Sequence, residues 1–354
     1  MTNALWSDIQ EQGDNLRHVV GRLFGEERPH LEAAARFLHN ERPIALVGVA
    51  SAEYLCMPAE VYLGRHGRYA SVMCASDALY SLLPALRHAN VVINSRSGET
   101  AEVVKLARAL AAEHIPFVAI TNEPESSLAG LAEHVLWVDC HKDELVSINV
   151  VTGMMTATLA LAAATVGELN ALRPLLESLP ERMDEAVARA SLQSADLQAH
   201  FAGMRPIYLL YRGAAKGAAY CGRLVLEEVS RTPSIAMGAA EFRQGPNEVI
   251  DERFAAVLFC GEGKQGELNL SLAGDIQRSG GRVLLVGEAR PVTGGPGERV
   301  FALPGLPDEW RAILEVVPVQ VLAYGLAQAQ GYAPGEVRYI SKIILSEEGI
   351  PKQG

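Results

Sequence analysis

Three hydroxyl side chains gather around one glycine within six residues of the chain: Ser95, Ser97 and Thr100. An apolar run at 91–93 predicts a buried strand before them, and apolar residues at helical spacing predict a helix after them. Backbone N–H groups at the start of a helix have no partner within the helix and carry partial positive charge. With Gly98 allowing a tight turn and Arg96 adding a full charge, this junction predicts a binding site for a phosphate monoester.

The same residues permit a simpler interpretation, in which Ser97 only caps the following helix. The order of the residues in the segment favours phosphate binding. Ser-Arg-Ser-Gly-Glu-Thr, at 95–100, resembles the Ser-x-Ser-Gly-Glu-Thr phosphate loop of sugar isomerase (SIS) domains. The turn at 48–51, after an earlier predicted strand, adds a fourth hydroxyl, that of Ser51.

Short β-rich runs alternate with helical stretches, which is typical of a parallel sheet covered by helices on both faces. In the first half we expect strands at 44–47, 69–74, 91–93, 117–120 and 135–138. In the second half we expect strands at 207–211, 254–259, 283–286 and 300–303. Long helices at 151–165 and 309–328 close the two halves. The common order of elements predicts a duplicated unit, and two unrelated α/β domains are the alternative.

We place the boundaries as a helical segment at 1–39, a first domain at 40–170, a helical connector at 171–200, a second domain at 201–331 and a tail at 332–354. The expected fold is α/β, with two tandem SIS domains, each a flavodoxin-like, three-layer parallel sheet flanked by helices. In the second half, the turn at 260–267 is acidic and rich in glycine. We expect it to bind phosphate poorly, so one half holds the phosphate.

The composition narrows the class of function. A net charge of −11 over 354 residues argues against nucleic acid or an anionic membrane as the main partner. The five cysteines form no C-x-x-C pair and no cluster with metal-ligand spacing, so we expect no metal and reduced thiols in the cytoplasm. The longest apolar segment, near 154–166, is too short to span a bilayer. No motif indicates a nucleotide or redox cofactor.

Three further segments resemble the isomerase half of glutamine–fructose-6-phosphate amidotransferase, a double-SIS family. Residues 226–229, Leu-Glu-Glu-Val, and 239–246, Ala-Ala-Glu-Phe-Arg-Gln-Gly-Pro, resemble a helix and loop of its second SIS domain. The tail 334–347 resembles its C-terminal segment. The resemblance covers about 40–347 and does not include a glutaminase domain.

The resemblance implies a role for each matching residue. Ser51, Ser95, Ser97 and Thr100 would hold the sugar phosphate. Glu228 would move a proton between C1 and C2, while Lys342 and Arg338 would lie near the open-chain carbonyl. The plainer alternatives are a surface charge for Glu228 and a solvated basic face for Lys342 and Arg338. Glu241 is expected to brace its loop.

Three positions depart from that family. Gln244 stands where the family has a histidine assigned to ring opening, and glutamine cannot exchange a proton at neutral pH. Val225 replaces a lysine. Asn149 replaces a serine, and with Ile148 it resembles a pattern of fructosamine-6-phosphate deglycases, so we include it among the substrate-binding candidates.

These observations predict an enzyme of aminosugar metabolism, a cytoplasmic isomerase/deaminase that acts on a phosphorylated sugar or aminosugar by proton transfer between C1 and C2. A fructosamine-6-phosphate deglycase and an aldose–ketose isomerase are the alternatives within the same chemistry. A sugar-phosphate sensor without catalysis is the alternative from another class. The resemblance implies a homodimer.

Overall fold

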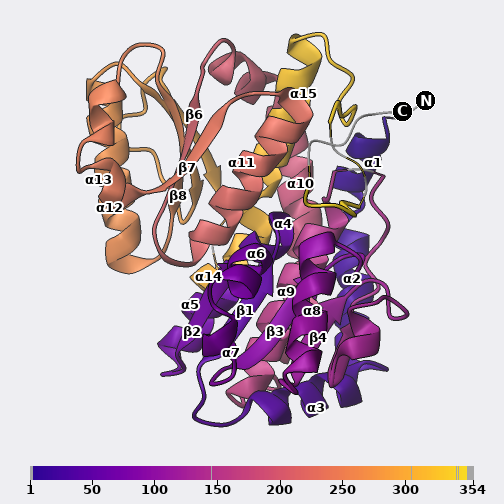
Figure 1. The fold of residues 1–354 in the computed structure, drawn as a ribbon. Helices are drawn as coiled ribbons and strands as arrows, with labels where there is room; N and C mark the ends of the chain where they lie inside the picture. Colours follow the sequence, from indigo (N-terminus) through magenta and orange to yellow (C-terminus); the bar gives the residue numbers. More distant parts are fainter. Residues whose placement is uncertain (1–2, 145, 304, 340, 342, 349–354) are drawn as a thin grey trace. The chain divides into compact units, whose positions relative to one another are not determined.

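The computed structural model describes residues 3–144, 146–303, 305–339, 341 and 343–348. The chain forms two compact units (Figure 1). The first unit comprises Glu11–Glu181 and Val337–Gly354, and the second comprises Met1–Gln10 and Arg182–Glu336. The chain changes unit three times, and the second change falls within helix α10 (Arg173–Phe201), which covers the predicted connector. The predicted domain boundaries stay a prediction.

The first unit is built on a five-stranded parallel sheet in the order β2-β1-β3-β4-β5. Its strands are β1 (Ile44–Gly48), β2 (Ala70–Cys74), β3 (Asn90–Ser95), β4 (Phe117–Thr121) and β5 (His134–Trp137). Strands β1, β3 and β4 are buried along their whole length. Their continuous apolar sequences therefore match a sheet with both faces covered.

Helices cover both faces of this sheet (Figure 1). On one face, α6 (Ala75–Tyr80) and α8 (Ala101–Ala112) pack with alternate residues of the strands, such as Val91 and Ile93. Around α9 (Asn149–Thr165) pack α2 (Gln12–Phe24), α3 (Arg28–Leu38) and α5 (Met57–Arg65). Helix α9 is almost entirely buried, as its apolar and small residues on every side require. The short helices are α4 (Ser51–Tyr54) and α7 (Leu83–Leu86).

The second unit has a parallel sheet in the order β10-β9-β8-β6-β7. Its strands are β6 (Ile207–Tyr211), β7 (Ser234–Gly238), β8 (Ala255–Cys260), β9 (Arg282–Gly287) and β10 (Glu298–Ala302). Its helices are α1 (Ala4–Gln10), α11 (Lys216–Ser230), α12 (Ala239–Phe242), α13 (Gly263–Arg278), α14 (Asp308–Glu315) and α15 (Val317–Ala329).

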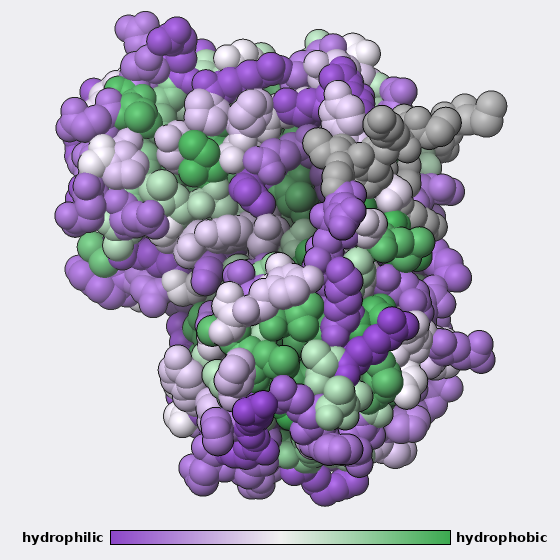
Figure 2. Space-filling model, in the orientation of Figure 1, coloured by the Kyte–Doolittle hydropathy of each residue, from purple (hydrophilic) through white to green (hydrophobic). Residues whose placement is uncertain are grey.

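Read from its other edge, the second sheet follows the strand order of the first. In chain order both are 2-1-3-4-5, which is the flavodoxin-like order. The expected fold class, α/β with two tandem flavodoxin-like units, is confirmed. Polar residues cover most of the face drawn in Figure 2, with apolar residues in patches between them. The apolar strands lie in the interior of each unit.

Three expectations need correction. Strand β7 was not predicted, and the single closing helix expected at 309–328 is two helices that meet at Val316. The longest apolar stretch is also elsewhere. Within the described residues, Asp308–Ala329 is the one helical stretch that is long and apolar enough to cross a membrane. Since 83% of its most apolar window is buried inside the protein, it resembles the core helix of a globular unit.

Candidate phosphate-binding site

The first unit brings Ser51 and the segment 95–100 to the same edge of one sheet. Ser51 follows β1 and opens α4, whereas the segment 95–100 connects β3 to α8. Strands β1 and β3 are hydrogen-bonded neighbours, and the strand order reverses between them. Ligands of open parallel sheets bind outside the carboxyl ends of the strands at such a reversal.

Two serine hydroxyls shape the loop from within. The Oγ of Ser95 accepts a hydrogen bond from the Gly98 amide at 3.1 Å, and the Oγ of Ser97 accepts one from the Glu99 amide at 3.2 Å. In both cases the oxygen is the acceptor, so each hydroxyl keeps its hydrogen for another acceptor. The loop therefore orients two donors before any ligand arrives.

Gly98 is required by both conformation and space. Its φ is +62°, a left-handed conformation that favours glycine, and its carbonyl accepts a hydrogen bond from the amide of Leu128. A Cβ at this position would lie 2.1 Å from Ser126 Oγ. The tight turn inferred from the sequence therefore also lets the loop pack closely against the segment after β4.

The other two hydroxyls belong to Ser51 and Thr100. Thr100 precedes α8 in the N-cap position with extended backbone, but its side chain makes no capping hydrogen bond. Among the residues that the structure describes, the hydroxyls of Ser51 and Thr100 have no hydrogen-bond partner. Two unengaged hydroxyls beside two preoriented ones suit the three acceptor oxygens of a phosphate group.

Arg96 extends toward the connection between β5 and α9. Its Nη1 donates to the Oγ of Ser147 at 3.3 Å, and its carbonyl oxygen accepts from the amide of Asn122 at 3.0 Å. A cavity of about 450 Å³ lies on this side of the loop. It is lined by residues of four segments: Arg96, Ser97, Glu99, Asn122, Glu123, Glu125, Ser126, Lys142, Asp143, Val150 and Ile343. Of the predicted phosphate ligands, Arg96 and Ser97 line this cavity.

The buried carboxylate of Asp143 holds the start of α9. Its oxygens accept from the amides of Ile148, Asn149 and Val150 at 2.9 to 3.0 Å. Burial raises the pKa of Asp143, while these hydrogen bonds act in the opposite direction. Asp143 is not among the residues predicted from the sequence, because it lies six positions before the first residue of α9.

Asn149 serves this same arrangement. Its side chain is fully buried, its Nδ2 donates to Asp143 Oδ1 at 3.1 Å, and its carbonyl oxygen accepts from Asn15 at 2.8 Å. It is not part of the cavity lining, whereas its neighbour Val150 is. Its predicted contact with substrate stays a prediction.

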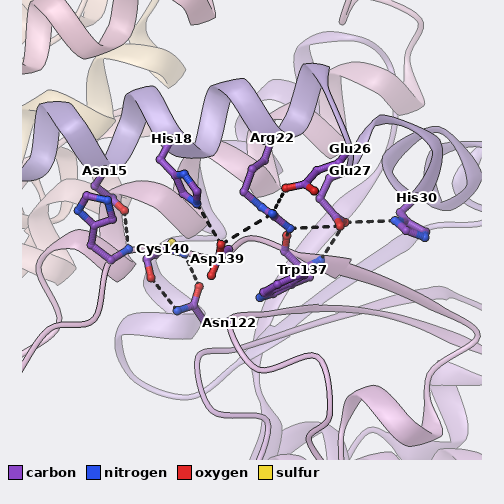
Figure 3. Close-up of polar contacts among 11 residues, drawn as sticks. Asn15, His18, Arg22, Glu26, Glu27, His30, Asn122, Trp137, Asp139 and Cys140 are labelled. Carbon is purple, nitrogen blue, oxygen red and sulfur yellow. Dashed lines mark hydrogen bonds and ion pairs between the residues drawn. The ribbon is translucent and has the colours of Figure 1, made fainter.

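A buried arginine fixes the end of β5, from which Lys142 and Asp143 continue toward the cavity. Arg22 stacks over the ring of Trp137 at 4.2 Å and pairs with Glu26, Glu27 and Asp139 (Figure 3). Asp139 also contacts His18, at 3.0 Å. The contacts of Arg22 thus connect α2 with the end of β5.

The backbone after Asp139 is held by two amide side chains. Asn122 both accepts from the Cys140 amide, at 2.5 Å, and donates to the Cys140 carbonyl, at 3.0 Å (Figure 3). Asn15 accepts from the amide of His141 at 2.9 Å.

Among the described residues, no cluster of histidine, cysteine and acidic side chains has the arrangement of a metal site.

The remaining predicted residues are divided between the units. Arg338 belongs to the first unit and is exposed. Lys342 lies outside the described residues. Glu228 lies half-buried on α11 of the second unit, next to Glu227, whose pKa is raised by burial. Gln244 is exposed, and its amide donates to the Glu241 carbonyl at 2.8 Å in the turn after α12.

The loop of the second unit that corresponds to 95–100 follows β8. Gly263 has a φ of +58°, close to that of Gly98, and in both cases the glycine is the third residue after the strand. A cavity of about 460 Å³ lies beside this loop, and Glu262 and Glu267 are among the residues that line it. Asp308 Oδ1 accepts from the Glu262 amide at 2.9 Å. Arg311, fully buried, pairs with Asp308 in turn. The expectation that the acidic turn binds phosphate poorly stays a prediction.

Comparison with known proteins identifies the first unit. Residues 37–164 match the SIS domain family. A curated relative from Pyrobaculum aerophilum, a glutamine–fructose-6-phosphate aminotransferase (isomerizing), is 25% identical over 348 residues, which are 96% of this chain and 57% of that protein. A relative of the same name from Bradyrhizobium diazoefficiens is 27% identical over 355 residues, with 96% and 58% coverage. The chain thus spans a little over half the length of these relatives.

Solved structures have the same fold over nearly the whole chain. The C-terminal domain of glucosamine-fructose-6-phosphate aminotransferase from Francisella tularensis has a TM-score of 0.79 at 19% identity, covering 94% of this chain and 97% of that one. Tagatose-6-phosphate ketose/aldose isomerase from Escherichia coli has a TM-score of 0.78 at 18% identity, covering 93% of this chain and 94% of that one. Glucosamine-6-phosphate deaminase from Thermotoga maritima has a TM-score of 0.75 at 20% identity, covering 96% of this chain and 99% of that one. Residues 37–164 thus form a SIS domain, and the predicted resemblance to SIS-domain proteins is confirmed.

Proposed function

We propose that this chain is an aminosugar-phosphate isomerase/deaminase. The observation that carries the proposal is the loop at 95–100. At the reversal of strand order it combines two preoriented serine hydroxyls, the unengaged hydroxyl of Thr100 and a helix N-terminus. The relatives and structural neighbours bear the names of sugar-phosphate isomerases, aminotransferases and deaminases, which supports a phosphorylated sugar as ligand.

In the proposed reaction, phosphate binding places the open-chain aldehyde of the aminosugar. Glu228 removes the proton from C2, and a proton is returned to C1 while the C1 oxygen becomes a hydroxyl. This transfer leaves an imine at C2, and water hydrolyses it to a ketose phosphate and ammonia. Lys342 and Arg338 would polarise the carbonyl oxygen by their positive charge. The proposal needs no redox cofactor, because the transfer moves protons only.

Two related reactions use the same proton transfer. The replacement of serine by Asn149 favours a fructosamine-6-phosphate deglycase, which would release an amino acid. The likeness to the ketose/aldose isomerase favours simple interconversion of aldose and ketose phosphates. A sensor that binds a sugar phosphate unchanged is the alternative without catalysis. We extend the proposal to a homodimer, as the family resemblance implies, and to the cytoplasm, as the widely spread cysteines indicate.

One assay separates these functions. The purified chain is incubated with glucosamine 6-phosphate, a fructosamine 6-phosphate and an aldose 6-phosphate, and ammonia, free amino acid and ketose phosphate are measured. We expect ammonia and ketose phosphate in equal amounts from the first substrate. Release of amino acid from the second would establish the deglycase instead. Binding of all three without any product would leave the sensor and refute the enzyme.

A further inference from the structure

The tail of the first unit crosses the start of the helix that follows the phosphate loop. The amide of Ala101, the first residue of α8, donates to the carbonyl of Ile344 at 3.0 Å. Amides in the first turn of a helix have no intrahelical acceptor. The carbonyl of Ile344 in the tail therefore supplies the acceptor that the first amide of α8 lacks within its own helix.

A second attachment lies three residues further along the tail. Glu347 Oε2 accepts from the hydroxyl of Tyr80 at 2.7 Å and pairs with Lys105 Nζ at 3.2 Å. Tyr80 is the last residue of α6, and Lys105 lies one turn after Ala101 in α8. One carboxylate thus bridges two helices that cover the same face of the sheet.

The charges of this contact agree with its geometry. The pKa of Glu347 is lowered by the Tyr80 hydrogen bond and by Lys105, so the carboxylate is ionised near neutral pH. The pKa of Lys105 is raised, mainly by its hydrogen bond with Glu347. The Glu347 side chain is only 21% exposed, compared with 52% for Lys105, so the carboxylate is the more enclosed partner.

The tail also reaches the cavity beside the loop. Ile343 lines the same cavity as Arg96 and Ser97. Ile344 and Glu347 thus attach the tail to α8 and α6, and Ile343 lines the cavity beside the loop. Arg338 and Lys342 immediately precede this anchored segment in the sequence.

We propose that Glu347 is a positioning residue. It anchors the tail to Tyr80 and Lys105, so that the tail that carries Arg338 and Lys342 is already ordered when the substrate binds. The inference rests on the proposed function for the part played by those two cations. The anchoring itself depends only on the contacts of the first unit. Without the anchor, the tail must be ordered anew in each catalytic cycle, at a cost in conformational entropy.

The test combines two single variants with a charge exchange. Glu347→Gln removes the charge at constant size, Lys105→Glu creates repulsion, and Lys105→Glu with Glu347→Lys restores an opposite pair. Glu348→Gln is the matched control, because this neighbouring carboxylate is exposed and makes no hydrogen bond or ion pair among the described residues. Three quantities are measured on the full chain. They are hydrogen exchange at the Ala101 amide, steady-state kinetics on the substrate that the assay above identifies, and calorimetric binding of inorganic phosphate.

We expect Glu347→Gln and Lys105→Glu to speed exchange at Ala101 and to lower kcat about tenfold, with the Kd for phosphate within twofold of wild type. The exchanged pair should restore both readouts, and Glu348→Gln should change neither. Unchanged exchange at Ala101 would overturn the anchor, and faster exchange with normal kcat would overturn the positioning role. A wild-type chain without turnover would refute the proposed function and, with it, the positioning role, whereas exchange at Ala101 would still decide the anchor.

Discussion

The Oγ of Ser97 accepts a hydrogen bond from the backbone amide of Glu99 at 3.2 Å. The acceptor bond turns the hydroxyl of Ser97 toward its own loop and fixes its rotamer. Glu99 in turn accepts from the amide of Ser127 through Oε1, at 2.6 Å. The loop is thus held between its own serine and the segment after β4.

Ser97→Ala should weaken phosphate binding while leaving the fold intact. Loss of a hydrogen bond to a charged group costs roughly 1.5–3 kcal/mol, so the Kd for a sugar phosphate should rise about tenfold or more. Calorimetric titration measures this change. Ser127→Ala is the matched control, because Ser127 contacts the loop through its backbone amide. Equal affinity of folded Ser97→Ala and wild type would remove Ser97 from the site.

Glu228→Gln should abolish most turnover without affecting phosphate binding. Glutamine preserves the size of the side chain but cannot take a proton, and general base catalysis contributes about a hundredfold or more. Turnover and exchange of the substrate proton with deuterated water are the two measurements. Glu227→Gln is the control on the same helix, where Glu227 pairs with Arg223 at 3.9 Å. A normal rate of proton exchange in Glu228→Gln would exclude Glu228 as the base.

Gln244→His should raise activity on sugars that cyclise. Gln244 is exposed in its turn, so a histidine of similar size has room, and it could exchange the proton that ring opening requires. Kinetics of both proteins are compared on a cyclising substrate and on an analogue that cannot cyclise. We expect wild type to be faster on the open analogue and the variant to narrow the gap. Equal wild-type rates on the two substrates, without gain from histidine, would show that Gln244 is structural.

Acid should destabilise the second unit through His200. Burial, followed by repulsion from Arg299, lowers its pKa from 6.5 to about 4. Between these values the unfolded chain binds a proton that the folded chain does not, so stability is complete above pH 6.5 and falls toward pH 4. The effect is at most about 3 kcal/mol.

Urea unfolding at pH 7, 6, 5 and 4 measures this dependence. His200→Asn should flatten the decrease in unfolding free energy over that window, whereas the exposed His88, replaced in the same way, should leave it unchanged. The same slope in wild type and His200→Asn would assign the acid sensitivity to other groups.

The sequence predicted the strands that are buried on both faces, because their apolar residues are consecutive. It missed β7, an edge strand whose residues after Ser234 are only half-buried. Alanine, methionine and glycine in that strand have weak β-propensity, so pairing with β6 decides its conformation. The break at Val316 had a local signal in Pro318, which lies in the first turn of α15.

The strand–loop–helix junction at 95–100 was predictable for a local reason: its hydroxyls, glycine and helix start are contiguous. The partners that support it are not. Tyr80 and Glu347 are 267 positions apart in the chain, and neither residue type predicts a contact at such a distance in sequence. Asp143 was overlooked because its carboxylate reaches amides from five to seven positions further on, beyond the spacing of ordinary helix caps.

That spacing also bears on how the first unit folds. Asp143 and the amides it binds are separated by a loop of only a few residues, and the entropy of closing such a loop is small. Helix α9, around which α2, α3 and α5 pack, thus carries its own nucleation site and need not await the distant pairing of the strands. We expect Asp143→Asn to slow folding more than it speeds unfolding, which stopped-flow kinetics would register as a high φ-value. The carboxylate at the start of α9 would then order this part of the chain early in folding, before the candidate binding loop beside it is complete.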